Sequence, residues 1–446
     1  MRRIAFSTLG CRLNQYETDA LVTTCKRAGY MVVDWHEPAD AYVINSCTVT
    51  DRSDRKTRQL IYQAGRAAGR QAGRQAGRDK DGRPIVVLTG CYADAQKKDP
   101  PQHHAITYVV DNDRKSQMFA IIDAHFRGEI VDPEGLAADR FSFGDSRDGF
   151  HTRGSIKIQD GCDNFCTFCI IPHVRGRAAS RPSLEVLDQA REMIDLGARE
   201  IILTGVNIGR YNFDGVTFSS LLEGMLGIPG DFRIRVSSIE PDVWEKGFLP
   251  LLEHPKLCPH LHLCLQSGSD RILLAMRRRY SVETYLGFVE SVRKLRPDFN
   301  FTTDIMVGFP GETQQDFENT CTVARQVGFS HIHTFPYSTR EGTRAARSTD
   351  QIEQNIKADR ARIIRDISNV AKRAYRARLV GQEQLVLVER MVENTVSGYG
   401  QHYVPITLPR FPGAEIGEFV RVRIESLTSD EEPRLIGATS KPLAHR

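Results

Sequence analysis

The chain has 446 residues, which is long for one ordinary domain and predicts two or three. Hydrophobic residues make up 40% and charged residues 26%, the composition of a soluble globular protein. Lys and Arg number 60 against 56 Asp and Glu, so any basic surface for a nucleic acid must be local. No apolar run could span a bilayer, and the segment after Met1 is too short and polar for a signal core. We therefore expect a cytoplasmic protein.

The first segment alternates short apolar strands with helices, which indicates a parallel sheet. Asn14 is expected to cap a helix over Gln15–Ala28, with Glu17 placed for a capping box and Gly29 as the stop. The expected strands are Ile4–Thr8, Ala41–Ile44 and Ile85–Leu88.

An Ala-Gly-Arg unit repeats between Gln63 and Arg78. Arginine at every fourth position would form one basic stripe on a helix. Glycine recurs as often, however, and each costs a helix about 1 kcal/mol relative to alanine. A mobile, solvated insertion and an electrostatic contact with RNA phosphates are both open interpretations.

Residues 132–151 are rich in Gly and Asp and are typical of a linker. Beyond them, six strand candidates each precede a helical stretch, and six such units predict a barrel or partial barrel. A helix over Ile352–Arg376 then leads to a tail whose short apolar runs predict a small β-barrel. The six candidates are Ser155–Gln159, Glu200–Leu203, Arg233–Val236, His260–Leu265, Phe301–Val307 and His331–Phe335. The runs in the tail are Gln384–Glu389, Phe419–Ile424 and Arg434–Ala438.

Three of the ten cysteines, Cys162, Cys166 and Cys169, form a C-x3-C-x2-C run directly after the first predicted barrel strand. In a reducing cytosol, clustered cysteines are more often metal ligands or catalytic groups than disulfides. Three thiolates this close can bind three irons of one cubane and leave the fourth iron open. A zinc site completed by His173 is the alternative.

Cys11, Cys47 and Cys91 are far apart in the sequence, but each follows a predicted strand by one or two small or polar residues. In a parallel α/β sheet all strand carboxyl ends face one edge, where ligands bind. We therefore expect the three thiols at one rim, and a second three-cysteine cluster is the economical interpretation. Chance placement of core thiols is the alternative.

Cys258, His260, His262 and Cys264 alternate along one predicted strand and resemble zinc ligands. Alternate residues of a strand are about 6.6 Å apart, so the outer pair would be separated by about 20 Å. Ligands that lie about 2.0–2.3 Å from one ion cannot come from that arrangement.

The polar face of this strand is expected to line the barrel interior together with Thr302 and Asp304 of the next strand. A cofactor cavity and a hydrogen-bonded polar core are the two interpretations. Cys25 and Cys321, on helix faces, are expected to be buried small hydrophobes.

With these residues in place, the sequence resembles the methylthiotransferases of the radical S-adenosylmethionine superfamily over nearly its whole length. The resemblance implies an α/β protein with an N-terminal parallel-sheet domain (1–131) and a linker (132–150). A partial (β/α)6 radical domain (151–376) and a C-terminal RNA-binding β-barrel called TRAM (377–442) would follow. The Ala-Gly-Arg repeat departs from the family pattern. The matching stretches are Thr8-Leu-Gly-Cys11, Ile44-Asn-Ser-Cys47, Thr89-Gly-Cys-Tyr92 and Gly161-Cys162 through Ile170-Ile-Pro172, with Arg175-Gly176 and Ser180-Arg181.

Further stretches look like the branch that acts on N6-threonylcarbamoyladenosine of tRNA. This branch adds a methylthio group to C2 of that nucleoside next to the anticodon (adenosine 37 of tRNA). The resemblance implies two 4Fe–4S clusters, two molecules of S-adenosylmethionine, an electron donor of flavodoxin or ferredoxin type and a sulfur source. The stretches are Ser7-Thr-Leu-Gly-Cys-Arg-Leu-Asn14, Leu203-Thr-Gly-Val-Asn-Ile-Gly-Arg-Tyr211, Val236-Ser-Ser-Ile-Glu-Pro241 and Phe335-Pro-Tyr-Ser338 with Gly342-Thr343.

The resemblance also implies roles for the cysteines. The cluster on Cys162, Cys166 and Cys169 would cleave S-adenosylmethionine to a 5′-deoxyadenosyl radical. The cluster on Cys11, Cys47 and Cys91 would be the site of sulfur methylation and transfer. Strand-end positions suggest a cofactor pocket, and the tail would hold tRNA phosphates, although its arginines could also be an ordinary solvated surface. The pocket candidates are Gly205, Ser238, Gln266 and Asp304, and the tail candidates are Arg410, Arg421 and Arg423.

Two other functions remain open at this stage. One is a sister enzyme that modifies isopentenyladenosine of tRNA. The other, of a different class, is a zinc-stabilised RNA-binding protein without catalytic activity.

Overall fold

The structure is a computed structural model that describes residues 1–72, 84–97, 105–144, 146, 149, 152–241 and 247–441. The chain forms two compact units, and each unit combines segments that are distant in the sequence. Unit 1 takes residues 1–151, 157–181 and 338–346, and unit 2 takes residues 152–156, 182–337 and 347–446. In the described part of the chain no helix is long and apolar enough to cross a membrane.

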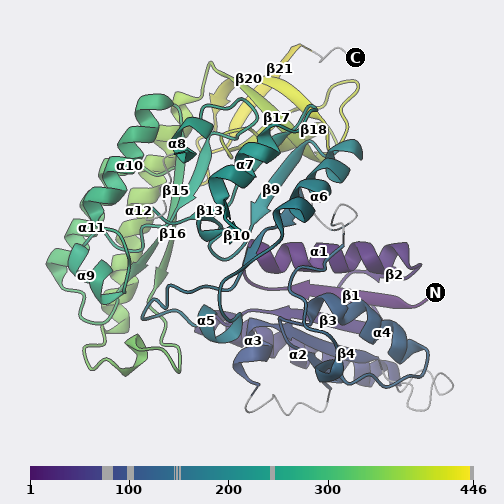
Figure 1. Cartoon of the computed structure of the whole chain (residues 1–446). Coiled ribbons are helices and arrows are strands. Elements are labelled where there is room, and N and C mark those ends of the chain that lie inside the picture. Colours follow the sequence, from purple (N-terminus) through teal and green to yellow (C-terminus); the bar gives the residue numbers. More distant parts are fainter. Residues whose placement is uncertain are drawn as a thin grey trace. The chain divides into compact units, whose positions relative to one another are not determined.

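A five-stranded parallel sheet forms the centre of unit 1, with the strand order β2-β1-β3-β4-β5. All residues of β3 and β4 are buried, as expected for central strands that helices cover on both faces. The strands are β1 (Arg3–Thr8), β2 (Met31–Val33), β3 (Ala41–Ser46), β4 (Ile85–Gly90) and β5 (Tyr108–Val110). The helices are α1 (Arg12–Arg27), α2 (Asp51–Ala72), α3 (Cys91–Ala95) and α4 (Met118–Phe126) (Figure 1).

The strands of unit 1 send alternate side chains into two hydrophobic layers. Ile4 and Val43 contribute to the layer that includes residues of α1 and α4. Tyr42 and Ile44 contribute to the layer that includes residues of α2 and α3. The predicted parallel α/β domain at the N-terminus is therefore confirmed.

The predicted start of the first helix is wrong. α1 begins at Arg12 after Cys11, and no side chain caps it. Asn14 instead donates from Nδ2 to the carbonyl oxygens of Leu9 and Ser46, at 2.8 and 3.0 Å. Glu17 is fully buried and makes ion pairs with residues far along the chain. Long-range partners have overridden the local capping pattern.

Two segments of unit 1 that the sequence singled out differ in how much of them the structure describes. In the segment predicted as a linker, Phe143 is buried in the α1–α4 layer, and its ring lies edge-on to Tyr16 at 5.9 Å. The Ala-Gly-Arg repeat continues α2 as far as Ala72. The rest of the repeat, residues 73–78, lies outside the described residues, as does the end of the predicted TRAM domain.

Unit 2 contains the barrel strands in two neighbouring sheets, with orders β12-β9-β6 and β13-β14-β15-β16. A bridge between Ile234 and Leu257 continues the pairing from β12 toward β14. The six predicted strands are all present, so the predicted partial barrel is confirmed. One further short strand, β13, comes between β12 and β14 in the sequence and begins the second sheet. The strands are β6 (Gly154–Lys157), β9 (Glu200–Thr204), β12 (Arg233–Val236), β13 (Ser238–Ile239), β14 (His260–Leu263), β15 (Asn300–Val307) and β16 (His331–Pro336).

Helices follow most of these strands along the chain and lie on the outer side of the strands in Figure 1. The predicted exit helix is present as α12, shifted by two residues. The helices are α6 (Ser183–Asp195), α7 (Phe218–Leu226), α8 (Phe248–Leu251), α9 (Asp270–Ala275), α10 (Val282–Leu295), α11 (Gln314–Val327) and α12 (Gln354–Arg378). Short elements complete the description: η1 (Lys115–Gln117), η2 (Pro133–Gly135), β7 (Gln159–Asp160), α5 (Ile171–Val174), β8 (Ala179–Ser180), η3 (Ile208–Arg210), β10 (Asn212–Phe213), β11 (Val216–Thr217) and η4 (Ala345–Arg347).

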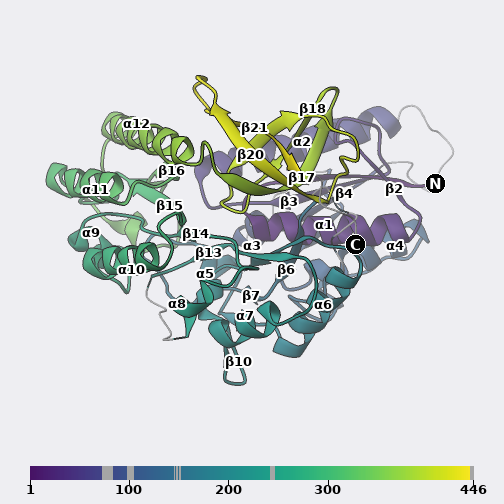
Figure 2. The same cartoon turned by 90° about the horizontal axis from the view of Figure 1, so that it is seen from above.

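The tail of the chain closes into a five-stranded barrel with the order β17-β18-β19-β21-β20, drawn in yellow-green and yellow in Figure 2. Its interior is filled by a separate apolar core. The predicted small β-barrel is confirmed, although two of its strands were not predicted. The strands are β17 (Glu383–Val392), β18 (Thr395–Tyr399), β19 (Pro405–Pro409), β20 (Phe419–Leu427) and β21 (Leu435–Lys441).

Candidate functional site

Cys11, Cys47 and Cys91, called here the sheet-edge trio, lie at the carboxyl ends of β1, β3 and β4. Cys11 precedes α1, and Cys91 is the first residue of α3. Each of the three thiols interacts electrostatically with the others, which places them close together. The structure therefore brings these three distant cysteines to one rim, as parallel strands require.

Two glycines beside the trio have positive φ and no room for a side chain. A Cβ on Gly10 (φ +102°) would lie 2.9 Å from Cβ and 3.0 Å from Sγ of Cys47. A Cβ on Gly90 (φ +95°) would lie 2.4 Å from the carbonyl oxygen of Ser46. Only glycine allows this backbone conformation together with such close approach, so both glycines hold the cysteine loops together.

Burial is the largest influence on the pKa of the two buried thiols of the sheet-edge trio, those of Cys47 and Cys91. It raises the pKa of Cys47 and raises the pKa of Cys91 to about 11. Arg175 and Lys115 act in the opposite direction on the pKa of Cys91, and the thiols of Cys11 and Cys47 reinforce the rise. Metal binding must displace the protons, so occupation of this trio would release protons.

Cys162, Cys166 and Cys169, called here the loop trio, lie in one loop between β7 and α5. Gly161 (φ +71°) precedes it, and a Cβ there would lie 2.1 Å from the carbonyl oxygen of Arg177. The amide of Cys162 donates to Gly176 at 3.2 Å, and the amide of Cys169 donates to Cys166 at 2.9 Å. The loop therefore turns back on itself, with its three thiols within one short segment.

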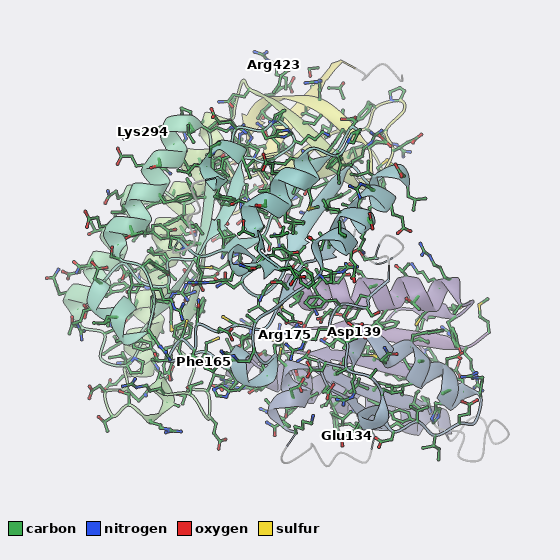
Figure 3. The ribbon with its side chains drawn as sticks, in the orientation of Figure 1. Glu134, Asp139, Phe165, Arg175, Lys294 and Arg423 are labelled. Carbon is green, nitrogen blue, oxygen red and sulfur yellow. The ribbon has the colours of Figure 1, made fainter. Side chains whose placement is uncertain are left out.

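Inside this loop Phe165 has a positive φ of 47°, which is uncommon for an aromatic residue. Its ring contacts His173 edge-on at 6.4 Å between ring centres, and the guanidinium of Arg177 lies 5.3 Å from the centre of the Phe165 ring. Figure 3 labels Phe165. His173, the proposed fourth zinc ligand, therefore packs on an aromatic ring. This contact favours a packing role for His173.

Both trios belong to unit 1, and their neighbouring segments contact each other. α5, which begins two residues after Cys169, packs on α3, which begins at Cys91. Asn112 connects the two helices because its Nδ2 donates to Asp94 at 2.7 Å and to the carbonyl oxygen of Val174 at 3.0 Å.

A cavity of about 660 Å³ opens beside both trios. Its walls come from segments that follow cysteines of each trio: Thr48 after Cys47, residues 94–97 after Cys91, and Ile170, His173 and Val174 after Cys169. Asp51 and Asp54 of α2 also line it. The remaining wall is formed by residues 339–342 of the loop 338–346. Its Arg340 donates to the carbonyl oxygen of Thr48 at 3.1 Å, pairs with Asp54 at 2.6 Å and contacts Asp51. This arginine anchors a late segment of the chain on the loop that carries Cys47.

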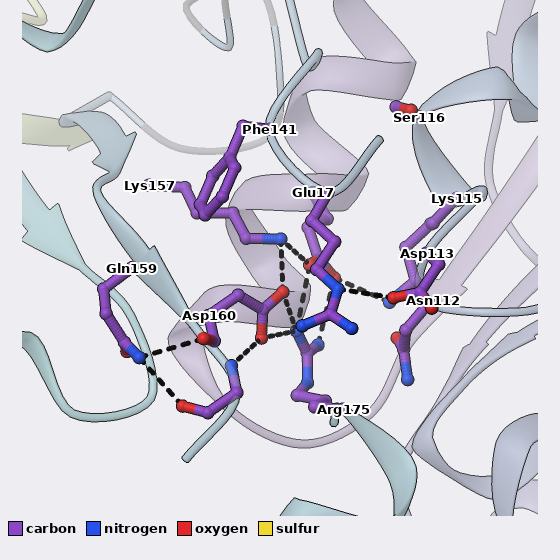
Figure 4. Close-up of polar contacts among 12 residues, drawn as sticks. Glu17, Asn112, Asp113, Lys115, Ser116, Phe141, Lys157, Gln159, Asp160 and Arg175 are labelled. Carbon is purple, nitrogen blue, oxygen red and sulfur yellow. Dashed lines mark hydrogen bonds and ion pairs between the residues drawn. The ribbon is translucent and has the colours of Figure 1, made fainter. Parts of the chain in front are cut away.

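Behind the two trios lies a buried set of ion pairs, called here the Glu17–Arg175 network (Figure 4). The carboxylate of Glu17 forms ion pairs with Lys115 at 2.6 Å, Lys157 at 2.9 Å and Arg175 at 3.1 Å. The carboxylate of Asp160 forms ion pairs with Lys157 at 2.6 Å and Arg175 at 3.0 Å. All five side chains are nearly inaccessible to solvent. None of them was singled out from the sequence as a functional residue, because no motif joins positions 17, 115 and 157–175.

In unit 2 the barrel interior carries a polar group on β14 and β15. His262 contacts Thr302 through Nδ1 at 3.0 Å and Asp304 through Nε2 at 3.4 Å, and Cys264 lies beside them. His262, Cys264 and Asp304 each offer one ligand atom, and these three atoms lie within 4.8 Å of one another, a spacing that could hold a metal ion. Burial and the charge of Asp304 raise the pKa of Cys264 well above its usual range.

Two of the four pocket candidates lie within strands of unit 2, Ser238 at the start of β13 and Asp304 in β15, and the other two, Gly205 and Gln266, follow β9 and β14. Ser238 pairs in register with His262, and Gly205 follows the end of β9. Gln266, with a positive φ of 65°, donates its amide to the carbonyl oxygen of Asp304 at 2.9 Å. The structure therefore brings Ser238, Gln266 and Asp304 to neighbouring strands of one sheet, with Gly205 after the end of β9 in the other sheet.

The other sequence predictions about cysteines and arginines can be placed in the same way. Cys25 and Cys321 are buried in helices, as expected. His260 contacts Thr302 at 3.1 Å, so a hydroxyl partners this histidine. Arg421 and Arg423 point outward from β20 between inward-facing valines, and Arg410 is exposed in the loop after β19. Figure 3 shows Arg423 at the outer face of the tail barrel.

Comparisons with known proteins give two family matches. Residues 156–324 match the model of the radical SAM superfamily, and residues 3–111 match the uncharacterized protein family UPF0004. The chain is 36% identical over 445 residues to a threonylcarbamoyladenosine tRNA methylthiotransferase MtaB of Bacillus subtilis (strain 168), covering 95% of this chain and 94% of that protein. A protein with the same name from Thermotoga maritima is 35% identical over 437 residues, covering 96% of each chain.

Solved structures with little sequence identity share the fold. One is the radical S-adenosylmethionine methyltransferase TsrM from Kitasatospora setae, with bound cobalamin and a 4Fe–4S cluster. It has a TM-score of 0.55 at 14% identity, over 77% of both chains. The cobalamin-dependent S-adenosylmethionine radical enzyme OxsB gives a TM-score of 0.50 at 12% identity, over 82% of this chain and 56% of that one.

Proposed function

Because this chain belongs to the radical S-adenosylmethionine tRNA methylthiotransferases, we propose that its substrate is N6-threonylcarbamoyladenosine next to the anticodon. The product would carry a methylthio group on C2. The reaction would use two molecules of S-adenosylmethionine and two 4Fe–4S clusters. The observation that carries this proposal is the presence of two cysteine trios in one compact unit. Two relatives named for this activity, each 35–36% identical, support the substrate.

The target carbon bears an unactivated C–H bond, which no side-chain base could deprotonate usefully near pH 7. The difficult step must therefore come from a cofactor. A cluster held by the loop trio would supply reductive cleavage of S-adenosylmethionine to a carbon radical, and one held by the sheet-edge trio would supply the sulfur to be methylated. The thiolates of each trio would bind three irons and leave one coordination position for a substrate.

The chain's own residues would position these groups. Gly161 and the turn from Cys162 to Gly176 would fix the loop trio, and Gly10 would keep Cys11 against Cys47. Ser238, Gln266 and Asp304, with Gly205 at the adjacent strand end, would hold the polar groups of S-adenosylmethionine. The polar groups of these residues, which are half-buried at Gly205, Ser238 and Asp304 and buried at Gln266, suit the ribose and amino-acid moieties.

The tail barrel is proposed to bind tRNA through phosphate contacts of Arg421 and Arg423, with Arg410 nearby. Replacing both Arg421 and Arg423 by alanine is expected to weaken the binding of tRNAs of different sequence to a similar extent. It should also reduce the salt slope of the logarithm of affinity by about two, one unit per lost phosphate contact. Filter binding across a salt series measures this slope.

Lys294→Ala is the matched control, because this exposed lysine on α10 pairs with Glu290 of the same helix at 2.8 Å. An unchanged slope in the double variant would assign the two arginines to an ordinary solvated surface.

Nucleoside analysis tests the substrate. Mass spectrometry of tRNA digests from a deletion strain is expected to show the loss of the methylthio form of threonylcarbamoyladenosine, with restoration by the intact gene. Loss of methylthio-isopentenyladenosine would instead identify the sister activity. The family matches are those of an enzyme, so the non-catalytic zinc protein is set aside. The electron donor, the sulfur source and the cytoplasmic location remain predictions.

A further inference from the structure

The Glu17–Arg175 network contains unequal numbers of positive and negative groups. Arg175, Lys115 and Lys157 provide three cations, whereas Glu17 and Asp160 provide two carboxylates. All five groups are buried, so this excess positive charge is poorly screened by solvent. A buried unbalanced charge is costly unless another charge compensates it.

The excess charge faces the sheet-edge trio. Burial lowers the pKa of Arg175, but the charges of Asp160 and Glu17 outweigh burial and hold this pKa well above its usual range. The thiols of Cys91 and Cys11 act on the pKa of Arg175 in the same direction as the two carboxylates. Burial lowers the pKa of Lys115, and Glu17 and the thiol of Cys91 oppose that change. In its oxidised form a 4Fe–4S core with three thiolates carries one net negative charge, because two positive charges meet three negative ones. The excess positive charge of the network and the net negative charge of such a cluster are therefore complementary.

Arg175 is also held in place on several sides. Its Nη2 donates to Asn14 Oδ1 at 2.6 Å, and Asn14 in turn donates to the carbonyl oxygen of Ser46, next to Cys47. Its Nη1 donates to both oxygens of Asp160 at 3.0 Å. Asp160 accepts the amide of Gly161 at 2.7 Å, directly before Cys162. One guanidinium therefore connects the backbone beside one trio with the backbone beside the other.

We propose that Arg175 is the positioning residue that compensates the charge of the cluster on the sheet-edge trio, with Glu17 and Asp160 orienting its guanidinium. This inference rests on the proposed function, since it requires a cluster at Cys11, Cys47 and Cys91. Reduction adds a negative charge to that cluster. Buried charge near the trio must therefore change how easily the cluster is reduced.

The test uses the full-length chain with Cys162, Cys166 and Cys169 all replaced by alanine, so that only the sheet-edge trio can hold a cluster. After anaerobic reconstitution, iron content is measured, and the reduction potential is followed by electron paramagnetic resonance. Arg175→Gln removes a positive charge and is expected to shift the potential to a more negative value. Glu17→Gln removes a negative charge and is expected to shift it to a more positive value.

The opposite signs separate electrostatics from structural damage, which would move both variants in the same direction. Arg175→Lys keeps the charge and should remain near the potential of the reference protein. Arg127→Gln, at the exposed end of α4, is the surface control and should leave the potential unchanged. If Arg175→Gln does not fold, Glu17→Gln and Arg175→Lys still decide the question.

Two results would overturn the inference. Potentials that stay unchanged in Glu17→Gln and Arg175→Gln, or that move in the same direction, would remove the compensating role while leaving the proposed function intact. A reference protein that holds no four-iron cluster would refute the proposed function itself, and with it this inference.

Discussion

Replacing Cys162, Cys166 and Cys169 together with alanine is expected to abolish the cleavage of S-adenosylmethionine and all methylthio transfer. Iron should fall from about eight to about four per chain, because one cubane is lost and the other remains. The loop of the loop trio is closed by a backbone hydrogen bond from Cys162 to Gly176, which alanine at position 162 can also make. Removal of the three thiols should therefore leave unit 1 folded. Chromatographic detection of 5′-deoxyadenosine and an iron assay after anaerobic purification measure both effects.

The same three-alanine change in Cys11, Cys47 and Cys91 should give a different pattern. Iron should again fall to about four per chain, but 5′-deoxyadenosine should still form without methylthio product. Cys25→Ala is the control, because this thiol lies within α1 and is buried in the α1–α4 hydrophobic layer, so its loss should change neither the iron content nor the product. Iron that is retained after either triple change would contradict the assignment of that trio.

Glu200→Gln is expected to destabilise unit 2 by about 3–5 kcal/mol, the usual cost of leaving a buried cation uncompensated. Glu200 accepts from Arg233 at 2.6 Å and from Arg235 at 2.7 Å, and all three residues are at most 4% exposed. The two arginines also donate to backbone carbonyls of the tail barrel, including those of Leu385 and Gln401. Chemical unfolding followed by circular dichroism measures the loss.

The control for this change is Glu290→Gln on the exposed surface of α10, which should leave stability nearly unchanged because solvent screens this ion pair. The stabilisation by Glu200 also depends on pH. Burial alone would raise the pKa of Glu200, but Arg233 and Arg235 hold it well below its usual range. The stabilisation is therefore complete above a pH of about 4.3 and is lost as the pH falls toward the lowered pKa. Equal losses in both variants would contradict a special role for Glu200.

The parts of the site that the sequence predicted follow from one rule of parallel sheets. Cys11, Cys47 and Cys91 each end an apolar run, and parallel strands necessarily bring such ends to one edge. Apolar runs also located the six barrel strands within a few residues. β18 and β19 were not predicted because serine, glycine and proline interrupt their apolar pattern.

The ionic partners could not be predicted, because their pairing is decided only by the tertiary fold. Glu17 stands three residues after Asn14, where a capping box is the natural interpretation from local sequence. Its partners Lys115 and Lys157 are 98 and 140 positions away. Arg340, which reaches Asp54 from 286 positions away, was hidden for the same reason.

The composition of unit 1 bears on how this enzyme can be divided. A fragment that ends at residue 131 would keep Cys11, Cys47 and Cys91 but lose Lys157, Asp160 and Arg175. Glu17 would then face Lys115 alone in a region that was closed to solvent, and Arg340 would no longer hold the loop of Cys47. The segments that carry the two cysteine trios are therefore expected to depend on each other for folding. Neither half is expected to be exchangeable between relatives as a cassette.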